Sequence, residues 1–388
     1  MLILALFPAL SYASADSFIR AEVADYLACY WMPAVLGFLL CMRNKLIDLS
    51  IWMNIALGGA VSAWVLNATS PDALCPTAAN PITSPNSLTQ VMLAMTAAIC
   101  AGGLVGFFNA VATRKTRFPS WLVTLFSTFV IWAGLWYFIP ANKIPVSEFA
   151  FDNLVSVFNY KTGNQETYTS LAGVRIIFAL LAFLTVVFIL MMRSVSRALT
   201  EDYLTKRRNQ LIAFVLSGML GAFSGLLWVM DASSSPLPNI FFDDLNIPAV
   251  AILAGGFFLR GNGRTLMSIF LALPAILIIT LWNQMIFLPV VFNVNLAVAL
   301  LILLAISCQL SVTNAIHAQP GKQIFAMLSA ALCTLALLLP PLLHFWEITG
   351  HTETTCITLG VLTAGIAAGL FSLTPISKHK FKKILQRL

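Results

Sequence analysis

The sequence predicts an all-α integral membrane protein, a polytopic helical bundle of about twelve spans. Of its 388 residues, 59% are hydrophobic and only 10% are charged. The apolar residues form long runs, and a membrane-spanning helix needs about 20 of them. The Lys and Arg residues are concentrated in alternate gaps between the runs. A spanning chain must also satisfy its own backbone hydrogen bonds, which favours helices over other structure.

The apolar runs define the expected helices in chain order. They cover about residues 2–15, 26–42, 51–67, 89–112, 120–138, 171–192, 210–230, 246–259, 265–287, 292–312, 323–346 and 354–375. The first run also resembles a signal peptide because it ends in Ala13-Ser14-Ala15, but it lacks a basic leading region. We expect it to form the outer half of a first membrane helix, since the charge pattern requires a crossing there.

The gaps between the runs alternate in charge. The basic gaps contain Arg43 and Lys45; Arg114, Lys115 and Arg117; Arg193, Arg197, Lys206, Arg207 and Arg208; Arg260 and Arg264; Lys322; and the tail residues Lys378, Lys380, Lys382, Lys383 and Arg387. Short loops rich in Lys and Arg mark the cytoplasmic side of a membrane protein. All the basic gaps fall on the cytoplasmic side only if both termini are cytoplasmic. Lys143 and Lys161 are exceptions, in the longest outer loop, where charge has least influence.

Several classes of function find no support in the sequence. The net charge of +7 comes from short loops and the tail, a distribution that suits anionic lipid better than nucleic acid. Neither H-E-x-x-H nor G-x-S-x-G occurs, and the seven cysteines form no C-x-x-C pair. His344, Glu347 and His351 are metal-capable residue types, but Thr349-Gly350 interrupts their common helix face. We therefore predict no catalytic residue, metal site or cofactor in this chain.

Glycines and other small residues mark two further features. Gly102, Gly103 and Gly106, and the run from Ser217 to Gly225, are spaced for close approach of helix backbones in lipid. A second group lies in residues 254–265 and resembles a phosphate-binding loop, but no Lys-Ser or Lys-Thr follows it. We interpret this segment as a break or tight turn between two short helices. The glycines of this helix-break loop are Gly255, Gly256, Gly261 and Gly263.

Several polar residues stand at the ends of the predicted spans or inside them. Asp48 and Ser50 precede an apolar run, where short polar side chains cap a helix. Asn54 and Asn109 fall inside the third and fourth spans, and such residues tend to face the bundle or a cavity. Asn283 and Gln284 follow Trp282 near the outer end of the ninth span, where they either anchor the interface or face a ligand.

Four segments in a fixed order carry a family resemblance. They are LIDLSIWMNIALGGAV (46–61), GLVGFFNAVATRKTRFPSWLVTLFS (103–127), VLSGMLGAFSGLL (215–227) and IPAVAILAGGFFLRGNGRTLMSIFLA (247–272). Their order resembles the permeases of ATP-binding-cassette (ABC) importers for ribose, galactose, autoinducer-2 and branched-chain amino acids. That family usually reads Gly-Ile-Asp-Leu-Ser in the first segment, and Leu46 stands here in place of the Gly.

The resemblance implies a type II, cobalamin-importer-like permease fold over residues 1–312. Residues 313–388 would add two further helices and a basic cytoplasmic tail. It also implies a second permease chain, a periplasmic or lipoprotein solute-binding protein and cytoplasmic ATPase subunits that use the ATP, all at the bacterial inner membrane. The path for a small polar solute, sugar-like in our interpretation, would run between spans two, three, seven and nine. Candidate path residues are Asn54, Asn109, Asn283 and Gln284.

The resemblance further implies that residues 193–209 form the loop that docks on the ATPase. Candidate docking residues are Arg197, Glu201, Asp202 and Arg207. The loop is shorter than usual and lacks the family's Gly-Gly-Asn-Glu run, of which Glu201 is the remnant. Two alternatives therefore stay open, a secondary transporter and a membrane-embedded transferase that has lost ATPase coupling. The first needs an ion site within the membrane, and the second needs paired carboxylates, for which Asp243 and Asp244 are the nearest match.

Overall fold

The computed structural model describes residues 31–44, 46–69, 87–116, 118–139, 144–146, 151, 203–232 and 234–235, with single positions at 178, 181, 185 and 275 and six between 324 and 335. The chain divides into two compact units, Ala21–Ile240 and a second made of Met1–Arg20 with Phe241–Leu388. The described helices with defined bounds all lie in the first unit. Within the described ranges the regular structure is helical, apart from one isolated bridge between Pro145 and Ser234.

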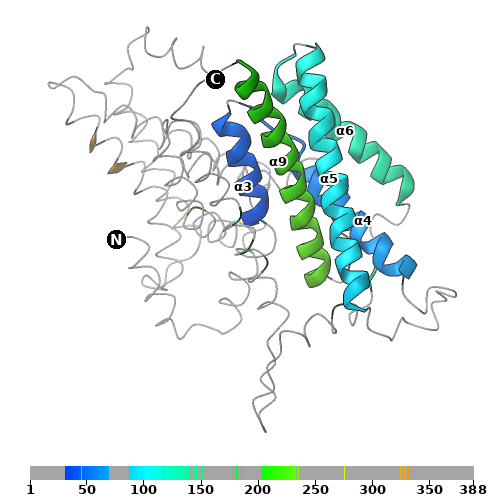
Figure 1. The fold of residues 1–388 in the computed structure, drawn as a ribbon. Coiled ribbons are helices and arrows are strands. Elements are labelled where there is room, and N and C mark those ends of the chain that lie inside the picture. The colour runs from blue at the N-terminus through cyan, green and yellow to red at the C-terminus, as the bar shows by residue number, and fades with distance from the viewer. Residues whose placement is uncertain are drawn as a thin grey trace. The chain divides into compact units, whose positions relative to one another are not determined.

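Five helices form the described part of the first unit (Figure 1). They are α3 (Met32–Arg43), α4 (Ile51–Thr69), α5 (Leu88–Thr116), α6 (Ser120–Phe138) and α9 (Tyr203–Ala232). These helices match the second, third, fourth, fifth and seventh predicted runs. Three of them, α4, α5 and α6, and the segment Arg208–Met230 of α9 are long and apolar enough to cross a membrane. The prediction of a helical membrane protein is thereby confirmed.

The other predicted spans lie outside the described residues, except for single helical positions. Those positions are at 178, 181 and 185, at 275, and at 324, 327, 328, 331, 332 and 335. The count of twelve spans, the type II fold and the boundary at residue 312 therefore stay predictions.

Two helices extend beyond the apolar runs that predicted them. α9 begins at Tyr203 rather than at residue 210, and α5 continues to Thr116 rather than to residue 112. The added segments contain Lys and Arg, which have high helix propensity, and no Gly or Pro. Arg114 and Lys115 also lie in the last turn of α5, where positive charge favours the helix dipole. Hydropathy alone thus underestimates the length of helices whose ends extend beyond the apolar layer of the membrane.

The start of α5 is fixed by a capping box. The backbone N–H of Gln90 donates to Ser87 Oγ at 3.3 Å, and the backbone N–H of Ser87 donates to the side-chain Oε1 of Gln90 at 2.6 Å. These reciprocal bonds satisfy donors that the helix leaves free. Gln90 Nε2 also donates to the carbonyl of Thr69, the last residue of α4. The box therefore ties the end of α4 to the beginning of α5.

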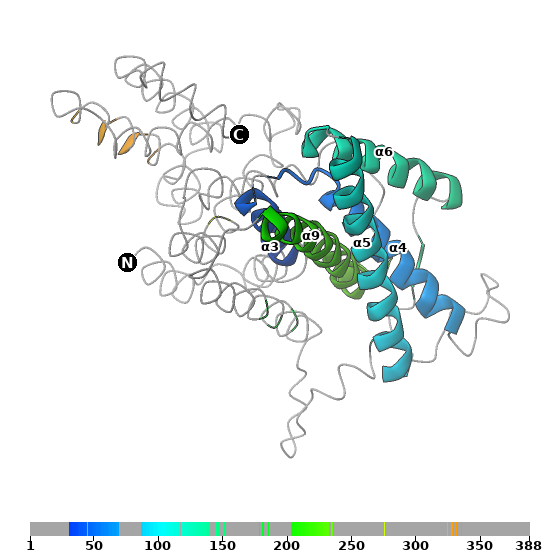
Figure 2. The same cartoon turned by 45° about the horizontal axis from the view of Figure 1, so that its top comes forward.

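Helix α9 lies at the centre of the described unit, between α3 on one side and α4 and α5 on the other (Figures 1 and 2). Glycines allow the backbones to touch. A Cβ added at Gly102 would overlap the carbonyl of Gly218, and one added at Gly58 would overlap the backbone of Ala222. This confirms the prediction that the small residues of the fourth and seventh spans serve helix packing.

Pairs of close contacts fix the helix directions. Along α5 and α9 the pairing runs from Gly102 with Gly218 to Gly106 with Phe214, so these helices are antiparallel. Gly37 of α3 lies beside Ser217, and Cys41 bonds the Ala213 carbonyl, so α3 is also antiparallel to α9.

Helix α4 instead runs parallel to α9. Gly221 lies against Ile51, and one turn further along both helices Gly225 lies against Ile55. The ends of α3 and α5 therefore lie toward the beginning of α9, whereas α4 begins beside Gly221, near the middle of α9. The basic residues at the ends of α3 and α5 and at the beginning of α9 are Arg43, Arg114, Lys115, Lys206, Arg207 and Arg208. Three of the gaps predicted to share one side of the membrane thus do lie at one end of the bundle.

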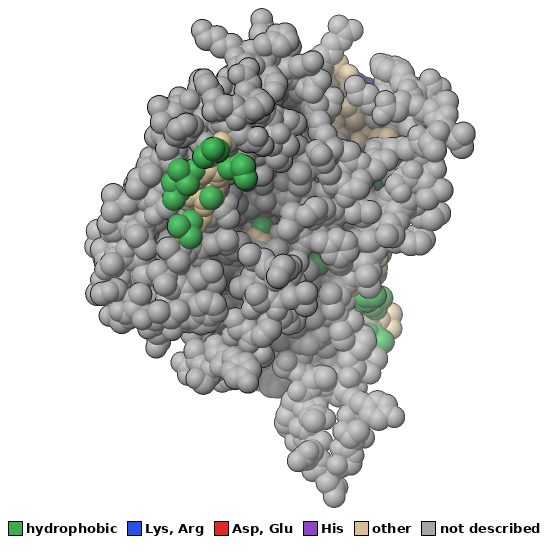
Figure 3. Space-filling model, turned by 90° about the vertical axis from the view of Figure 1, so that its left-hand side faces the viewer, with side chains coloured by type: hydrophobic (Ala, Val, Ile, Leu, Met, Phe, Trp, Pro, Cys, Tyr) green, Lys and Arg blue, Asp and Glu red, His purple; other side chains and the backbone are tan. Residues whose placement is uncertain are grey.

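The outer faces of α5 and α6 are apolar, as lipid contact requires. Their exposed large side chains include Leu104, Phe107, Phe108, Phe126, Phe129 and Val130. Exposed Trp121 begins α6 and exposed Trp136 and Tyr137 end it, as is typical of residues at the membrane interface. In the second unit, the exposed large side chains among the described residues are also apolar, at Ile324, Met327, Leu328 and Leu335. Hydrophobic side chains likewise dominate the described surface in Figure 3.

The close glycine contacts predict a position-specific cost of adding a methyl group. We expect Gly218→Ala to destabilise the protein by about 1–3 kcal/mol, because its Cβ would overlap the Gly102 carbonyl. The matched control is Gly134→Ala, since Gly134 on α6 has open space around its Cα. There the higher helix propensity of Ala should leave stability unchanged or raise it by up to about 1 kcal/mol. Thermal unfolding in mild detergent measures both, and equal effects of the two substitutions would contradict the packing.

Candidate functional site

The segment between α3 and α4, residues 46–50, is not helical, yet three of its residues are buried and the other two half-buried. We call it the connector. Its Leu46 is 5% exposed, and Asp48 and Ser50 are 0% exposed. Irregular backbone inside a membrane bundle is tolerated only when protein groups or a water-filled cavity satisfy its N–H and C=O groups. The connector therefore depends on partners from the surrounding helices.

Helix α6 supplies most of the partners for the connector backbone. The Ile47 N–H donates to Ser120 Oγ, and the Leu49 N–H donates to Thr124 Oγ1, both at 3.0 Å. Thr128 Oγ1 lies 2.9 Å from the Leu49 carbonyl and donates to it. The three hydroxyl residues are four positions apart and so share one face of the helix. This stripe of hydroxyls replaces the hydrogen bonds that a helix would give the connector.

The Asp48 carboxylate is held by hydroxyls from two directions. Its Oδ1 accepts from the Ser50 N–H at 3.1 Å and from Ser50 Oγ at 2.6 Å. Its Oδ2 accepts from Ser217 Oγ of α9 at 2.6 Å. Both oxygens of this buried side chain therefore accept hydrogen bonds.

Ser50 extends the polar contacts to α4, α5 and α6. Its Oγ accepts from Asn109 Nδ2 at 2.9 Å and, more weakly, from Asn54 Nδ2 at 3.4 Å. Asn109 Oδ1 in turn accepts from Ser127 Oγ of α6. We call Asp48, Ser50, Asn54, Asn109, Ser127 and Ser217 the polar cluster. It joins the connector to four helices with neutral donors and one carboxylate.

The expectation that Asp48 and Ser50 act as simple helix caps needs correction. Ser50 does stand at the helix start, since its carbonyl accepts from the Asn54 N–H at 2.9 Å. Its hydroxyl, however, is engaged with Asp48 and Asn109, and the Asp48 carboxylate reaches across to α9. Both side chains therefore make tertiary contacts that link helices, because burial leaves no water to satisfy them.

The structure brings two of the candidate path residues together. Asn54 and Asn109 both bond Ser50 Oγ and are buried. Asn109 uses both ends of its amide, whereas Asn54 Oδ1 is buried without a hydrogen-bond partner among the described residues. Asn283, Gln284, the four helix-break glycines, Arg197, Glu201 and Asp202 lie outside the described residues. Arg207 lies near the start of α9.

The hydroxyl residues of this site were not predicted from the sequence. Ser120, Thr124 and Thr128 give a visible signal, since hydroxyls recur every four residues along an otherwise apolar span. Ser217 and Ser127 give no comparable signal, because a single Ser in a small-residue helix is typical of packing. Their role emerges only from the tertiary contacts with Asp48 and Asn109.

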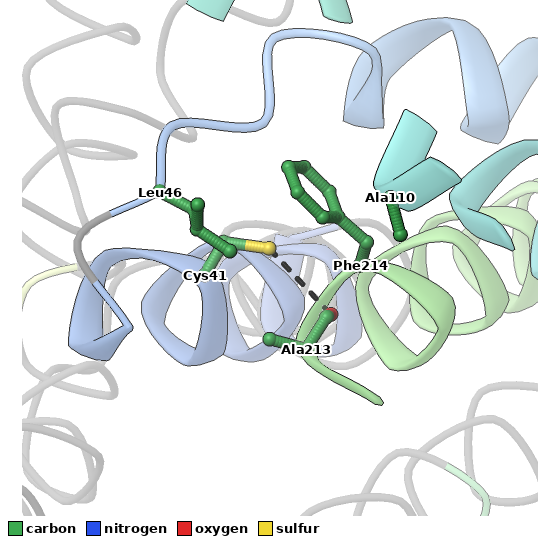
Figure 4. Packing of buried hydrophobic residues seen from close by; sticks show 5 residues of the cluster. All are labelled: Cys41, Leu46, Ala110, Ala213 and Phe214. Carbon is green, nitrogen blue, oxygen red and sulfur yellow. Dashed lines mark hydrogen bonds between the residues drawn. The ribbon is translucent and has the colours of Figure 1, made fainter. Parts of the chain in front are cut away.

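An apolar cluster seals the connector at the end where the basic residues lie (Figure 4). It consists of Cys41, Leu46, Ala110, Ala213 and Phe214. The Cys41 thiol donates to the Ala213 carbonyl at 3.5 Å, which links α3 to α9. Cys41 thus behaves as a small, weakly polar core residue.

The residues that match a known protein family include most of these elements. Residues 25–196 match the family described as the branched-chain amino acid transport system / permease component. The match covers α3, the connector, α4, α5 and α6, and so includes the polar cluster except Ser217. No curated protein and no solved structure matches the chain.

The hydroxyl stripe predicts the effect of removing one bond to the connector. Thr124→Val keeps the side-chain shape but leaves the Leu49 N–H without its acceptor, so we expect a loss of about 1–3 kcal/mol in stability. Thr96→Val is the control, because exposed Thr96 on α5 bonds only the Met92 carbonyl of its own helix. We expect that change to stay within about 0.5 kcal/mol. Denaturant unfolding in detergent distinguishes the two, and an unaffected Thr124→Val variant would count against the role of the stripe.

Proposed function

We propose that this protein is the permease subunit of an ABC importer. In this role it forms the membrane path for a small polar solute and hydrolyses no ATP itself. The observation that carries the proposal is the match of residues 25–196 to a permease component of transport systems. The four membrane-length helices are consistent with a path-forming subunit. The ordered resemblance beyond residue 196 supports the ABC assignment.

The proposed assembly has the parts that the resemblance implies. Cytoplasmic ATPases would supply the energy, a second permease chain would complete the path, and a periplasmic or lipoprotein binding protein would deliver the solute. The shared basic end of α3, α5 and α9 would face the cytoplasm of a bacterium by the positive-inside rule. Arg207 near the start of α9 would then lie on the side where an ATPase docks.

The polar cluster supports a neutral, hydrogen-bonding solute such as a sugar. Its groups in the membrane bundle are mainly amides and hydroxyls, which match the hydroxyls of a sugar. Asn54 is the stronger path candidate of the two buried asparagines, because its Oδ1 still has capacity to accept a hydrogen bond. The glycine contacts close the seams between α9 and its neighbours α4 and α5, so the path would run beside these seams rather than through them.

A pull-down from native membranes in mild detergent tests the proposed function. We expect an ATPase subunit with a nucleotide-binding loop to co-purify with the wild-type chain. The Glu201→Ala/Arg207→Ala double variant should lose it, because these side chains are proposed to dock on it. Lys143→Ala in the predicted outer loop is the control and should retain the ATPase.

The outcomes separate the candidate functions. Loss of the ATPase from the double variant alone would support both the importer and the docking position. A stable wild-type chain that brings down no ATPase would overturn the importer assignment and favour the secondary transporter or the membrane-embedded transferase.

A further inference from the structure

We propose that Ser217 and Asp48 are positioning residues that couple the ATPase-facing end of α9 to the connector and thereby to the path. This inference rests on the proposed function as an ABC importer permease. It goes further by naming the contact through which movement of the docking end reaches the polar cluster. Neither residue is proposed to touch the solute or ATP.

Helix α9 is suited to carry such a movement. It is continuous from Tyr203 to Ala232, and no Pro interrupts it. At a rise of 1.5 Å per residue, Ser217 lies about 15 Å along the axis from Arg207. No Gly occurs between these two residues, so the segment from the proposed docking end to the cluster has no local hinge. A displacement at Arg207 would therefore arrive at Ser217 largely undiminished.

The Ser217 hydroxyl is the point where α9 is tied to the connector. The packing of α9 against α4 and α5 consists largely of glycines and small residues, whose contacts are close but not directional. The bond from Ser217 Oγ to Asp48 Oδ2 is short, at 2.6 Å, buried and made to a carboxylate. Such bonds are strong and have a fixed geometry, especially away from water. They add a directional contact to the close packing of the small residues.

The connector distributes that movement to the other helices. From Asp48 the contacts continue through Ser50 to Asn54 at the start of α4 and to Asn109 of α5. The connector backbone passes it to α6 through Thr124 and Thr128. A shift of α9 would therefore rearrange the partners of Asn54, the candidate path residue with an unused acceptor.

The chain just beyond the end of α9 is also hydrogen-bonded to another segment. The Ile144 N–H donates to Ser235 Oγ, and the Ser235 N–H donates to the Ile144 carbonyl, both at 2.8 Å. Asn67 near the end of α4 donates to the Pro145 carbonyl at 2.9 Å. The chain of α9 is therefore linked to the connector at Ser217, in the middle of the helix, and to residues 144–145 just beyond its end.

The chain offers a matched control for this proposal. Ser224 lies two turns after Ser217 on the same helix and is equally buried. Its hydroxyl, at 3.2 Å, donates to the Leu220 carbonyl of its own helix rather than to another element. Ser217→Ala and Ser224→Ala thus remove the same atom at equal burial, but only the first disconnects α9 from Asp48.

The test uses the full importer complex in proteoliposomes, with ATP inside and solute-loaded binding protein outside. We measure ATP hydrolysis and solute uptake for each variant. For Ser217→Ala we expect hydrolysis within roughly twofold of wild type but uptake per ATP reduced roughly tenfold, as the loss of one buried bond to a charged group allows. Asp48→Ala, which removes the acceptor of the Ser217 hydroxyl, should show the same separation, and the two together should lose little more. Ser224→Ala should keep the wild-type ratio.

The measured ratio of uptake to hydrolysis tests the coupling role directly. A wild-type ratio in Ser217→Ala, or an equal loss of hydrolysis and uptake, would overturn the coupling role. If Ser217→Ala fails to fold, Ser217→Cys keeps the side-chain volume with a weaker donor, and an unchanged ratio there would overturn the role equally. If the wild-type complex itself shows no ATP-driven uptake, the proposed function fails first, and the coupling role falls with it.

Discussion

The burial of Leu46, Asp48 and Ser50 in a non-helical connector constrains the rest of the described unit. Residues 46–50 lie inside the bundle without the internal hydrogen bonds of a helix, so every polar group they carry must find a partner on another element. This requirement explains why α6 presents hydroxyls at every fourth position, and why a serine of α9 points to Asp48. It also explains why Asn109 of α5 is directed to Ser50 instead of to lipid.

Two kinds of contact hold these helices together. Glycine seams between α9 and its neighbours bring backbones together at specific positions and bury area. The polar cluster adds short, directional bonds whose loss is costly in the absence of water. A transport subunit needs both, since its helices must pack closely and still pass between defined arrangements.

The sequence predicts the helices far better than the site. Five apolar runs reappear as α3, α4, α5, α6 and α9, because about 20 consecutive apolar residues have few alternatives to a spanning helix. Local interpretation failed at Asp48 and Ser50, which look like caps when only their sequence neighbours are considered. Their true partners, Ser217 and Asn109, are 169 and 59 positions away in the chain. Contacts at such separations cannot be recognised in a single sequence. The four-residue spacing of Ser120, Thr124 and Thr128, in contrast, can be recognised there.

The bond between Asp48 and Ser217 is the contact on which the polar cluster and the proposed coupling most directly depend. A double-mutant cycle measures that bond as a free energy of unfolding, using wild type, Asp48→Ala, Ser217→Ala and the double variant in the same detergent. We expect a coupling energy of about 1–3 kcal/mol, because each single change already removes the bond that the second would remove. Effects that add within about 0.5 kcal/mol would mean that the two residues act independently and would contradict the link.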